Sequence, residues 1–343
     1  MLILKVWGRL SKAMIELLDE KTIAFGPVPS RRLGRSLGIN NIPPKTCSYS
    51  CVYCQLGKTS KITVNRQAFY HPYDILKEVR RKADNATVRN ERIDYLTFVS
   101  DGEPTLDINL GKEISILKKI GTPIAVITNA SLLWRKDVKE DLLEADLVSL
   151  KVDAVSETLW RGINRPHKGL RLNLILEGMR EFAENFEGTV FSETMLIDGA
   201  DYEGEFERIA EFLRELKKLD KAYIAIPTRP PTEKWARPAK EEDINAAFQV
   251  FSEKLGANRV EYLIGYEGNA FAFSGNVEEN LLSITAVHPM RKEAVEAFLK
   301  KDCTNWRAIE KLLEENKLIE LEYEGTKYYM RKLPSRRKLS SSF

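Results

Sequence analysis

The sequence predicts an α/β protein built on a parallel sheet, followed by a smaller unit of different pattern. Three observations lead to this expectation: apolar runs alternate with amphipathic runs from residue 36 to 255, the apolar runs are unbroken, and the pattern changes after about residue 275. Unbroken apolar runs are typical of strands buried on both faces, and strands that alternate with helices pair in parallel. A chain of 343 residues suits one large domain and a smaller one.

Six strand-like runs and six helical runs make up the first part of the chain. We expect strands at 36–42, 93–100, 123–130, 147–154, 188–198 and 221–228. We expect helices at 73–83, 109–120, 136–145, 170–186, 203–219 and 241–255. This periodicity fits an open doubly wound sheet and a barrel equally well. In both, the loops that follow the strands gather at one edge of the sheet, where chemistry is expected.

The last part of the chain has the pattern of helix, strand, helix, helix and hairpin. We expect a short helix at 277–282, a strand at 283–287, a helix with Pro289 in its first turn, a second helix capped by Thr304, and a hairpin over 319–333 around Gly325. This order resembles a winged helix, which binds nucleic acid or serves as an interaction module. The second long helix, 304–317, carries three basic residues and three acidic ones, so its net charge is zero. A neutral helix binds phosphates poorly, and direct reading of duplex DNA is therefore not expected.

These patterns divide the chain into four segments. We expect an N-terminal extension at 1–24, an α/β domain at 25–274, a winged-helix-like α+β domain at 276–333, and a basic tail without fixed structure at 334–343. The stretch 331–343 holds five of the 53 Lys and Arg residues and no acid, which leaves 48 basic against 50 acidic residues elsewhere. The body of the protein therefore lacks the strongly basic composition of a nucleic-acid-binding domain.

Composition also indicates in which cellular compartment the protein is expected. Hydrophobic residues make up 43% of the chain, but no apolar run approaches the ~20 residues of a membrane span. The first residues are too soon charged for a signal peptide, and four unevenly spaced cysteines do not form a disulfide framework. We therefore expect a cytoplasmic protein, with no membrane partner, whose clustered thiols bind a ligand. The charged fraction of 30% is similar to that of thermophile proteins.

The segment KTCSYSCVYC, residues 45–54, carries three of the four cysteines, Cys47, Cys51 and Cys54. It follows the first predicted strand, so it lies at the edge where chemistry is expected. Three thiolates can bind three irons of a cubane cluster and leave one iron open. Zinc is the alternative, but it needs a fourth donor, and the nearest histidine, His71, begins a helix across a polar loop. Cys303 lies 249 residues beyond Cys54, and we expect it to be a buried apolar residue rather than a ligand.

The CxxxCxxC spacing, with the aromatic Tyr53 before the third cysteine, resembles the signature of the radical S-adenosylmethionine (radical SAM) superfamily. The resemblance implies a partial (β/α)6 barrel and a [4Fe–4S] cluster held by the three cysteines. It also implies that S-adenosylmethionine binds to the open iron, with Tyr53 among the residues near it. Zinc would not account for this aromatic residue.

Three further strand ends are similar to superfamily motifs. SDGEPTL, 100–106, resembles the GGEP element, and the resemblance implies that Gly102 and Glu103 receive the cofactor's ammonium group. TNAS, 128–131, places Asn129 where the superfamily faces the ribose. SLKVDA, 149–154, places Ser149 and Lys151 at a polar–Leu–Lys element of related activating enzymes. A lysine inside an apolar strand needs an anion, either the cofactor carboxylate or a protein carboxylate, Asp153 or Glu103.

Two other segments, 25–40 and INRPHKG at 163–169, are similar to a subgroup related to the wyosine-base synthases of tRNA. Those synthases carry a second cluster on three additional cysteines near the N-terminus, and this chain has none there. Wyosine chemistry is therefore not expected, nor is that of cobalamin-dependent relatives.

The resemblance implies that the reduced cluster cleaves S-adenosylmethionine to methionine and a 5′-deoxyadenosyl radical, which removes hydrogen from a substrate. An electron donor, such as a ferredoxin or flavodoxin, is then required. No catalytic side chain is assigned, and the oligomeric state is not predicted.

The substrate signals are groups of basic residues beside the predicted site. They are Arg31, Arg32 and Arg35 before the first strand, Arg165, His167 and Lys168 after the fourth, and Arg229, Trp235 and Arg237 after the sixth. They either grip a phosphate and stack a base or are solvated surface charges. Three hypotheses stay open: a radical enzyme acting on RNA such as tRNA, a radical enzyme acting on a protein or peptide, and a non-catalytic metal-bearing regulator that binds nucleic acid. SDGEPTL and SLKVDA weigh against the third.

Overall fold

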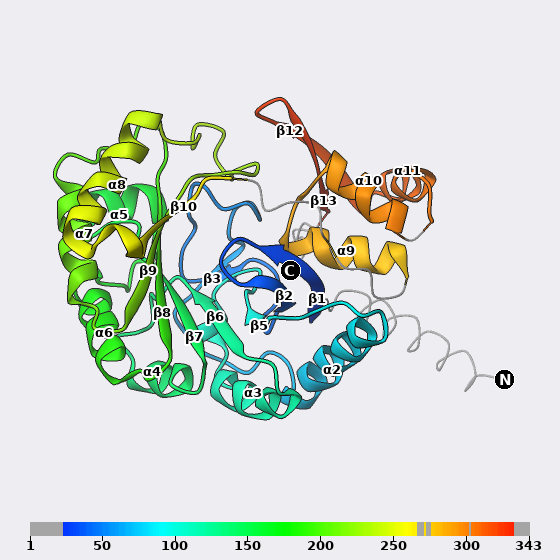
Figure 1. Cartoon of the computed structure of the whole chain (residues 1–343), viewed down its shortest axis with the longest axis horizontal. Helices are drawn as coiled ribbons and strands as arrows, with labels where there is room; N and C mark the ends of the chain where they lie inside the picture. The colour runs from blue at the N-terminus through cyan, green and yellow to red at the C-terminus, as the bar shows by residue number, and fades with distance from the viewer. Residues whose placement is uncertain (1–22, 266–270, 272–275, 302, 333–343) are drawn as a thin grey trace, which may run out of the picture.

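An eight-stranded sheet forms the centre of the fold. The computed structural model describes residues 23–265, 271, 276–301 and 303–332. In spatial order the strands are β1 (Ala24–Ser30), β2 (Gly34–Ile39), β5 (Tyr95–Phe98), β6 (Ile124–Thr128), β7 (Leu147–Lys151), β8 (Thr189–Met195), β9 (Leu219–Ala225) and β10 (Val260–Leu263). Strand β1 is antiparallel to β2, and every later neighbouring pair is parallel. Figure 1 shows the sheet curled, with helices on its outer side, so the predicted partial α/β barrel is confirmed.

The six predicted helices are present between the strands. They are α2 (Pro72–Val88), α3 (Leu110–Leu117), α4 (Lys136–Leu142), α6 (Leu172–Asn185), α7 (Glu205–Glu215) and α8 (Glu241–Leu255). The sequence analysis missed β1, β10 and α5 (Glu157–Asn164). Strand β1 contains Pro27 and Pro29, which argue against a strand except at a sheet edge, where β1 lies. Helix α5 spans eight residues, including Gly162, and its pattern is too short to recognise.

Alternation along the strands separates an outer core from an inner surface. Val126, Val148 and Leu150 point outward and pack in the main hydrophobic core beneath the helices. Their neighbours Ala125 and Leu147 point inward and join a smaller cluster with Leu33, Phe191, Tyr223, Ala225 and Leu263. Leu33 comes from the turn between β1 and β2, so this turn closes on the inner face of the sheet. On β7 and β8 the inner positions that follow toward the carboxyl ends carry polar side chains, namely Ser149, Lys151 and Glu193.

The last part of the described chain has the predicted order of helix, strand, helix, helix and hairpin. Its elements are α9 (Val277–Val287), β11 (Met290–Arg291), α10 (Lys292–Lys301), α11 (Arg307–Glu314), β12 (Leu318–Tyr323) and β13 (Thr326–Arg331). The three strands form one antiparallel sheet in the order β11-β13-β12. We call residues 276–332 the C-terminal module. Its identification as a winged helix stays a prediction.

Three details of the predicted module are wrong. The strand expected at 283–287 is the second half of α9, because Val277, Leu281 and Ile284 repeat at helical spacing and are all buried. Helix α10 begins at Lys292 rather than in the turn with Pro289. Helix α11 begins at Arg307 after Trp306, so Thr304 is not its N-cap.

The C-terminal module shares a hydrophobic core with strand β1. Phe25 and Val28 of β1 pack with Leu281, Ile284 and Phe298 of the module. The module is therefore bound to the barrel through a continuous apolar contact, beside β1 in Figure 1. Nearly all of the expected N-terminal extension, the end of the expected α/β domain at 272–274 and the basic tail lie outside the described residues. Among the helices that the structure describes, none has the length and apolarity needed to cross a bilayer.

The shared core predicts that Phe25 stabilises the module as well as the barrel. Phe25 is 2% exposed, and Phe25→Ala should lower the free energy of unfolding by about 3 kcal/mol, since it leaves a cavity between the two parts. Thermal denaturation and limited proteolysis of the C-terminal module measure this effect. The control is Tyr73→Ala, which removes a ring that is 60% exposed and should change neither readout. Equal proteolysis of both variants would contradict the shared core.

Candidate functional site

One cavity of about 320 Å³ brings together most of the residues that the sequence singled out. It lies at the carboxyl ends of the strands and is lined by the cysteine loop, by the segments after β5 and β6, and by inner residues of β7 and β8. The predicted site residues in its wall are Cys47, Cys51, Tyr53, Cys54, Gly102, Glu103, Asn129 and Lys151. The remaining one, Ser149, is buried below them, and its hydroxyl oxygen accepts a hydrogen bond from Arg32 Nη1 at 3.2 Å.

The cysteine loop is held in place by short ladders on both sides. Strand β3 (Thr46–Cys47) pairs in parallel with β4 (Lys61–Ile62). On the other side, the Val52 N–H donates to the carbonyl of Ile163 at 2.9 Å, at the end of α5. Helix α5, which the sequence analysis missed, is therefore the support against which the loop folds.

Nitrogen donors lie beside the cysteine sulfurs. Cys47 Sγ is 3.5 Å from the Tyr49 backbone nitrogen and 3.5 Å from Asn129 Nδ2. Cys51 Sγ is 3.5 Å from Asn164 Nδ2. Such donors stabilise a thiolate, and the same contacts tune the potential of a bound iron–sulfur cluster. The donor set therefore fits three thiolate ligands.

Burial raises the pKa of all three cysteine thiols, that of Cys51 to about 12, with Asp153 adding to the effect there. A metal must therefore displace protons when it binds, which makes its affinity depend on pH. Within the described residues, no three His, Cys, Asp or Glu side chains converge closely enough to hold a single metal ion.

Gly102 lets the segment after β5 approach the cysteine loop. A Cβ atom at this position would overlap the backbone carbonyl of Thr46, the residue before Cys47. The next residue, Glu103, donates its backbone N–H to the same carbonyl at 3.2 Å. Glycine is required here because of the close approach rather than because of its backbone angles.

The Glu103 carboxylate is buried and joins two loops. It accepts hydrogen bonds from the Thr105 N–H and hydroxyl, the Thr128 hydroxyl and the Asn129 N–H, at 2.6–3.1 Å. Burial raises its pKa, and these four donors act in the opposite direction. Asn129 continues the network, because its Nδ2 also donates to Ser48 Oγ at 2.9 Å. Glu103 thus fixes the ends of β5 and β6 beside the first cysteine.

Lys151 pairs with a carboxylate that the sequence analysis did not name. Its Nζ is 2.5 Å from Glu193 Oε1, so the expected protein partners, Asp153 and Glu103, are wrong. Lys151 and Glu193 lie side by side in the register of β7 and β8, and both point inward. Arg32 forms a second ion pair with Glu193. The sequence did carry a signal for Glu193, because it is a charged residue within the otherwise mostly uncharged strand β8.

Tyr53 lies between this ion pair and the cysteines. Lys151 Nζ is 5.1 Å from the centroid of the Tyr53 ring, a cation–π distance. The Tyr53 hydroxyl donates to Asp153, which also accepts from Asn164 Nδ2 at 2.6 Å. Asn164 belongs to the INRPHKG segment, whose resemblance was noted without assigning this residue. Its nearness to Cys51 and Tyr53 could not be read from sequence, because Asn164, the last residue of α5, is 113 positions from Cys51 along the chain.

The basic residues proposed for substrate divide into two groups. Arg31, Arg32 and Arg229 line the cavity. The others do not line it: Arg35 pairs with Glu91, Arg165 with Glu233 and Arg237 with Asp198, and His167 and Lys168 are absent from its wall. Trp235 is 49% exposed. The loop from 227 to 238 therefore contributes one cation to the cavity and one aromatic ring to the surface.

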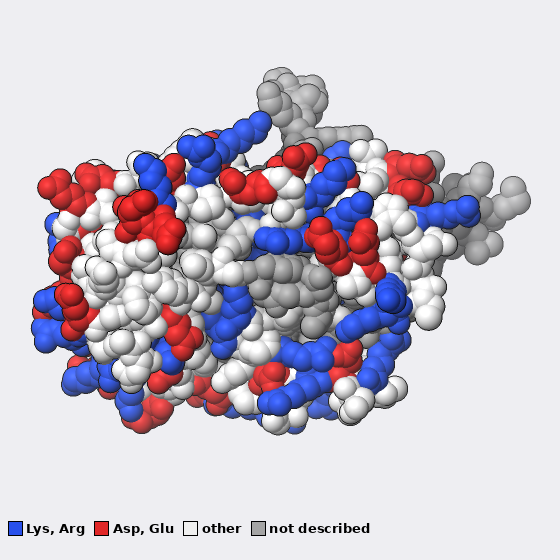
Figure 2. Space-filling view, turned by 45° about the horizontal axis from the view of Figure 1, so that its top comes forward, with Lys and Arg blue, Asp and Glu red and all other residues white. Residues whose placement is uncertain are grey.

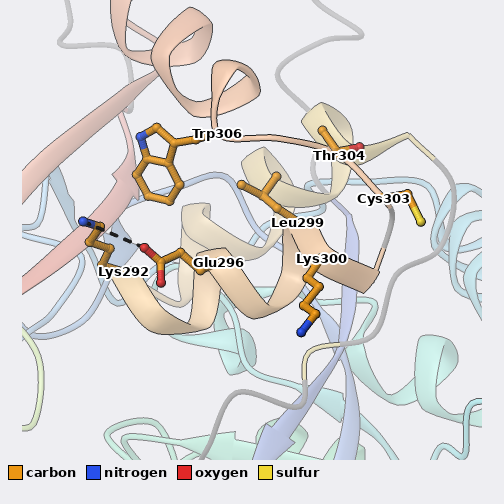
Figure 3. A pocket seen from close by; sticks show the side chains of 7 residues that line it. All are labelled: Lys292, Glu296, Leu299, Lys300, Cys303, Thr304 and Trp306. Carbon is orange, nitrogen blue, oxygen red and sulfur yellow. Dashed lines mark ion pairs between the residues drawn. The ribbon is translucent and has the colours of Figure 1, made fainter.

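Cys303 lies in a separate surface groove on the C-terminal module. Figure 3 shows the groove against α10, lined by Lys292, Glu296, Leu299, Lys300, Cys303, Thr304 and Trp306. Cys303 is exposed, so its predicted burial is wrong. It has a left-handed φ of 52° after α10, and Thr304 N–H donates to the Leu299 carbonyl at 3.0 Å, which is a helix C-cap geometry. The cap, rather than packing, accounts for its position.

Asp101 is a buried carboxylate that the sequence analysis overlooked. It is 2% exposed, and its Oδ2 accepts from Asn40 Nδ2 at 3.1 Å, while its Oδ1 has no hydrogen-bond partner among the residues that the structure describes. Burial raises the pKa of Asp101 from 3.8 to about 7. The unfolded chain therefore loses this proton near pH 4 and the folded chain near pH 7, so the group lowers stability as pH rises between these values.

This carboxylate predicts a pH-dependent effect of Asp101→Asn. The free energy of unfolding of Asp101→Asn minus that of the wild type should be about 2 kcal/mol larger at pH 8 than at pH 5. The reason is that the wild type must bury a charge at pH 8, whereas the variant has no charge to bury. Urea denaturation at the two pH values measures it. Asp84→Asn, which removes an exposed carboxylate, is the control variant in the same measurement. A difference independent of pH would show that the Asp101 charge is not the cause.

Known proteins similar to this chain give its family. The sequence model of the family described as "Radical SAM superfamily" matches residues 41–213 of this chain. The chain is 52% identical over 318 residues to UPF0026 protein MJ1312 of Methanocaldococcus jannaschii, across 92% of this chain and 98% of that protein. It is 39% identical over 208 residues to UPF0026 protein slr1464 of Synechocystis sp., across 60% of this chain and 76% of that protein.

A solved structure of TYW1 with a lysine–pyruvate adduct bound overlaps this chain with a TM-score of 0.49 at 14% identity. The overlap covers 64% of this chain and 73% of that one. The family rests instead on the sequence match across half of the chain and on the relative that matches nearly end to end. By these matches, the chain belongs to the radical SAM superfamily of enzymes.

Proposed function

We propose that this enzyme binds a [4Fe–4S] cluster and cleaves S-adenosylmethionine reductively. The observation that carries the proposal is that three cysteines and five residues of the resembled cofactor motifs line one cavity. Cys47, Cys51 and Cys54 would hold the cluster. The bound cluster, once reduced, would supply the one electron needed to cleave S-adenosylmethionine to methionine and a 5′-deoxyadenosyl radical.

The protein side chains have separate tasks in this proposal. Asn129 and Asn164 donate to the sulfurs of Cys47 and Cys51, which favours the thiolate forms. The backbone at Gly102 lies against the carbonyl of Thr46 in the cysteine loop, and Lys151 would offer a cation for the carboxylate of S-adenosylmethionine. Glu103 acts by fixing loops, since both of its oxygens already accept protein hydrogen bonds. A ferredoxin or flavodoxin would supply the electron.

The proposed substrate is RNA, with tRNA as the leading candidate. Two features support it: Arg229 faces the cavity while Trp235 is exposed on the same loop, and the C-terminal module contacts this loop. The Tyr328 hydroxyl donates to the carbonyl of Thr228 at 2.8 Å. An exposed tryptophan near arginines suits base stacking and phosphate contacts. The module would then hold RNA beside the site.

A protein or peptide substrate is the second candidate. Figure 2 shows Lys and Arg interspersed with Asp and Glu over the face in view, with no region of one sign covering it. RNA-binding surfaces are usually more uniformly basic. The third hypothesis, a non-catalytic regulator, is set aside because the chain belongs to a superfamily of enzymes.

Paired cysteine variants test the cluster. Anaerobically reconstituted wild type should bind about four irons and, with dithionite and S-adenosylmethionine, release 5′-deoxyadenosine without substrate. Cys51→Ala should lose both iron and product. The matched Cys303→Ala removes an exposed thiol and should retain both. Iron analysis and chromatography give the result, and one tightly bound zinc in place of iron would refute the proposal.

Two tryptophan variants test the proposal that the substrate is RNA. Unfractionated tRNA should bind, with affinity falling steeply between about 50 and 200 mM salt, and Trp235→Ala should weaken it at least about fivefold through lost stacking. The control, Trp134→Ala, removes a ring that is 43% exposed and lies between β6 and α4. Fluorescence anisotropy measures both. Absence of binding at low salt, or equal loss in both variants, would favour the protein substrate.

A further inference from the structure

One long stretch of the chain contains no acidic residue. No Asp or Glu occurs from residue 21 to residue 73, although 50 of the 343 residues of the chain are acidic. The stretch includes the cysteine loop and the segment that follows it, residues 55–62. Carboxylates that offset its positive charge must therefore come from other elements of the fold.

Such carboxylates reach the arginines of this stretch but not its described lysines. Three arginines each form an ion pair with a carboxylate of another element: Arg32, Arg35 and Arg66. Within the part of the chain that the structure describes, no carboxylate lies at ion-pair distance from Lys45, Lys58 or Lys61. These three ammonium groups keep their charge available to a partner.

The three lysines gather beside the cysteine loop. The Lys61 N–H donates to the Lys45 carbonyl at 3.1 Å. Lys45 Nζ lies beside Gly57, at 3.4 Å from the position that a Cβ atom there would take, and Lys58 is the next residue. Lys58 and Lys61 are exposed. We call the four residues Lys45, Lys58, Lys61 and Ile62 the lysine face.

The lysine face lies one strand away from the first cysteine. Cys47 and Ile62 are partners in the parallel pair of β3 and β4, and neighbouring strands are about 4.8 Å apart. Ile62 is 44% exposed. On the other side of the same segment, Leu56, Gly57 and Thr59 line the main cavity. At Ile62, a single strand therefore separates Cys47 from solvent.

We propose that the lysine face is the docking surface for a ferredoxin, a small acidic protein that carries one electron. This inference rests on the proposed function. The ferredoxin is oxidised by one electron, the cluster held by the three cysteines is reduced by one electron, and no atom is transferred. The lysines would attract the acidic surface and orient it, while Ile62 would supply apolar contact at the centre. Transient electron-transfer complexes bury less than about 1,200 Å² in total, so a small face is sufficient.

Two observations favour a protein over RNA on this face. Its one exposed apolar side chain, Ile62, is not aromatic, so the face offers no ring on which a base could stack. The loop proposed to contact RNA, 227–238, meets the cysteine loop elsewhere, since Thr232 Oγ1 donates to the Cys54 carbonyl at 2.8 Å. Of the two electron carriers named above, a ferredoxin is the smaller and suits a face of four residues.

Charge reversal tests the docking surface. Isothermal titration of the reconstituted wild type with a ferredoxin should show binding that weakens between about 50 and 200 mM salt, because salt screens the attraction. Lys58→Glu with Lys61→Glu should weaken binding at least about tenfold. The same variant should release less 5′-deoxyadenosine with limiting reduced ferredoxin, yet as much as the wild type with dithionite, which needs no docking surface.

Two further double variants serve as controls. Lys217→Glu with Lys218→Glu makes the same change in net charge just before β9, at the amino ends of the strands, and should bind ferredoxin like the wild type. Lys58→Gln with Lys61→Gln removes the two charges without reversing them. It should show a smaller loss in the same direction, and it decides the question if the charge-reversed variant fails to retain iron.

The same preparation separates this inference from the proposed function. A wild type that holds no iron, or that releases no 5′-deoxyadenosine with dithionite, refutes the proposed function. A wild type that does both but binds no ferredoxin, or binds it no more tightly than the lysine variants do, overturns the docking surface alone. Binding of a flavodoxin but not of a ferredoxin also overturns it. Loss of tRNA binding in the lysine variants, with ferredoxin binding unchanged, would assign the face to RNA instead.

Discussion

The buried junction between Gly102, Glu103 and Thr46 is the constraint on which the site depends. The Glu103 N–H and the absence of a side chain at Gly102 bring the segment after β5 against the carbonyl of Thr46, next to the first cysteine. The Glu103 carboxylate then holds the segment after β6 through Thr128 and Asn129. Because four donors offset the cost of burying this carboxylate, the loops around the cavity are fixed before any ligand binds.

The inner face of the sheet places charge where the strands end. The same two-residue alternation that buries Leu147 in the inner cluster brings Lys151, four residues on, to the same face beside Glu193. The Lys151–Glu193 pair and the Tyr53 ring then form a connected wall that ends at the cysteine loop. Apolar packing in the inner cluster and the ionic contact at the ends of β7 and β8 are thus two results of one strand pattern.

Local patterns in the sequence were enough to predict the repeat of the barrel and eight residues of the cavity wall. Periodicity fails where an element depends on its neighbours: β1 is a strand despite its prolines because it lies at an edge, and 283–287 is helical because the module's core selects one helical face. Side-chain partners and exposure also cannot be predicted from sequence for the same reason. The partner of Lys151 is set by strand register, and the exposure of Cys303 by a helix cap, neither of which a single sequence displays.

The C-terminal module contacts the loop that brings Arg229 to the cavity. Its Phe298 and Ile284 share a core with Phe25 of β1. Its His288 contacts Arg229, and its Tyr328 holds the carbonyl of Thr228 at the start of the same loop. A shift of the module relative to the barrel would therefore also displace Arg229, which lines the cavity. The loop after β9 thus takes its position from both parts of the chain.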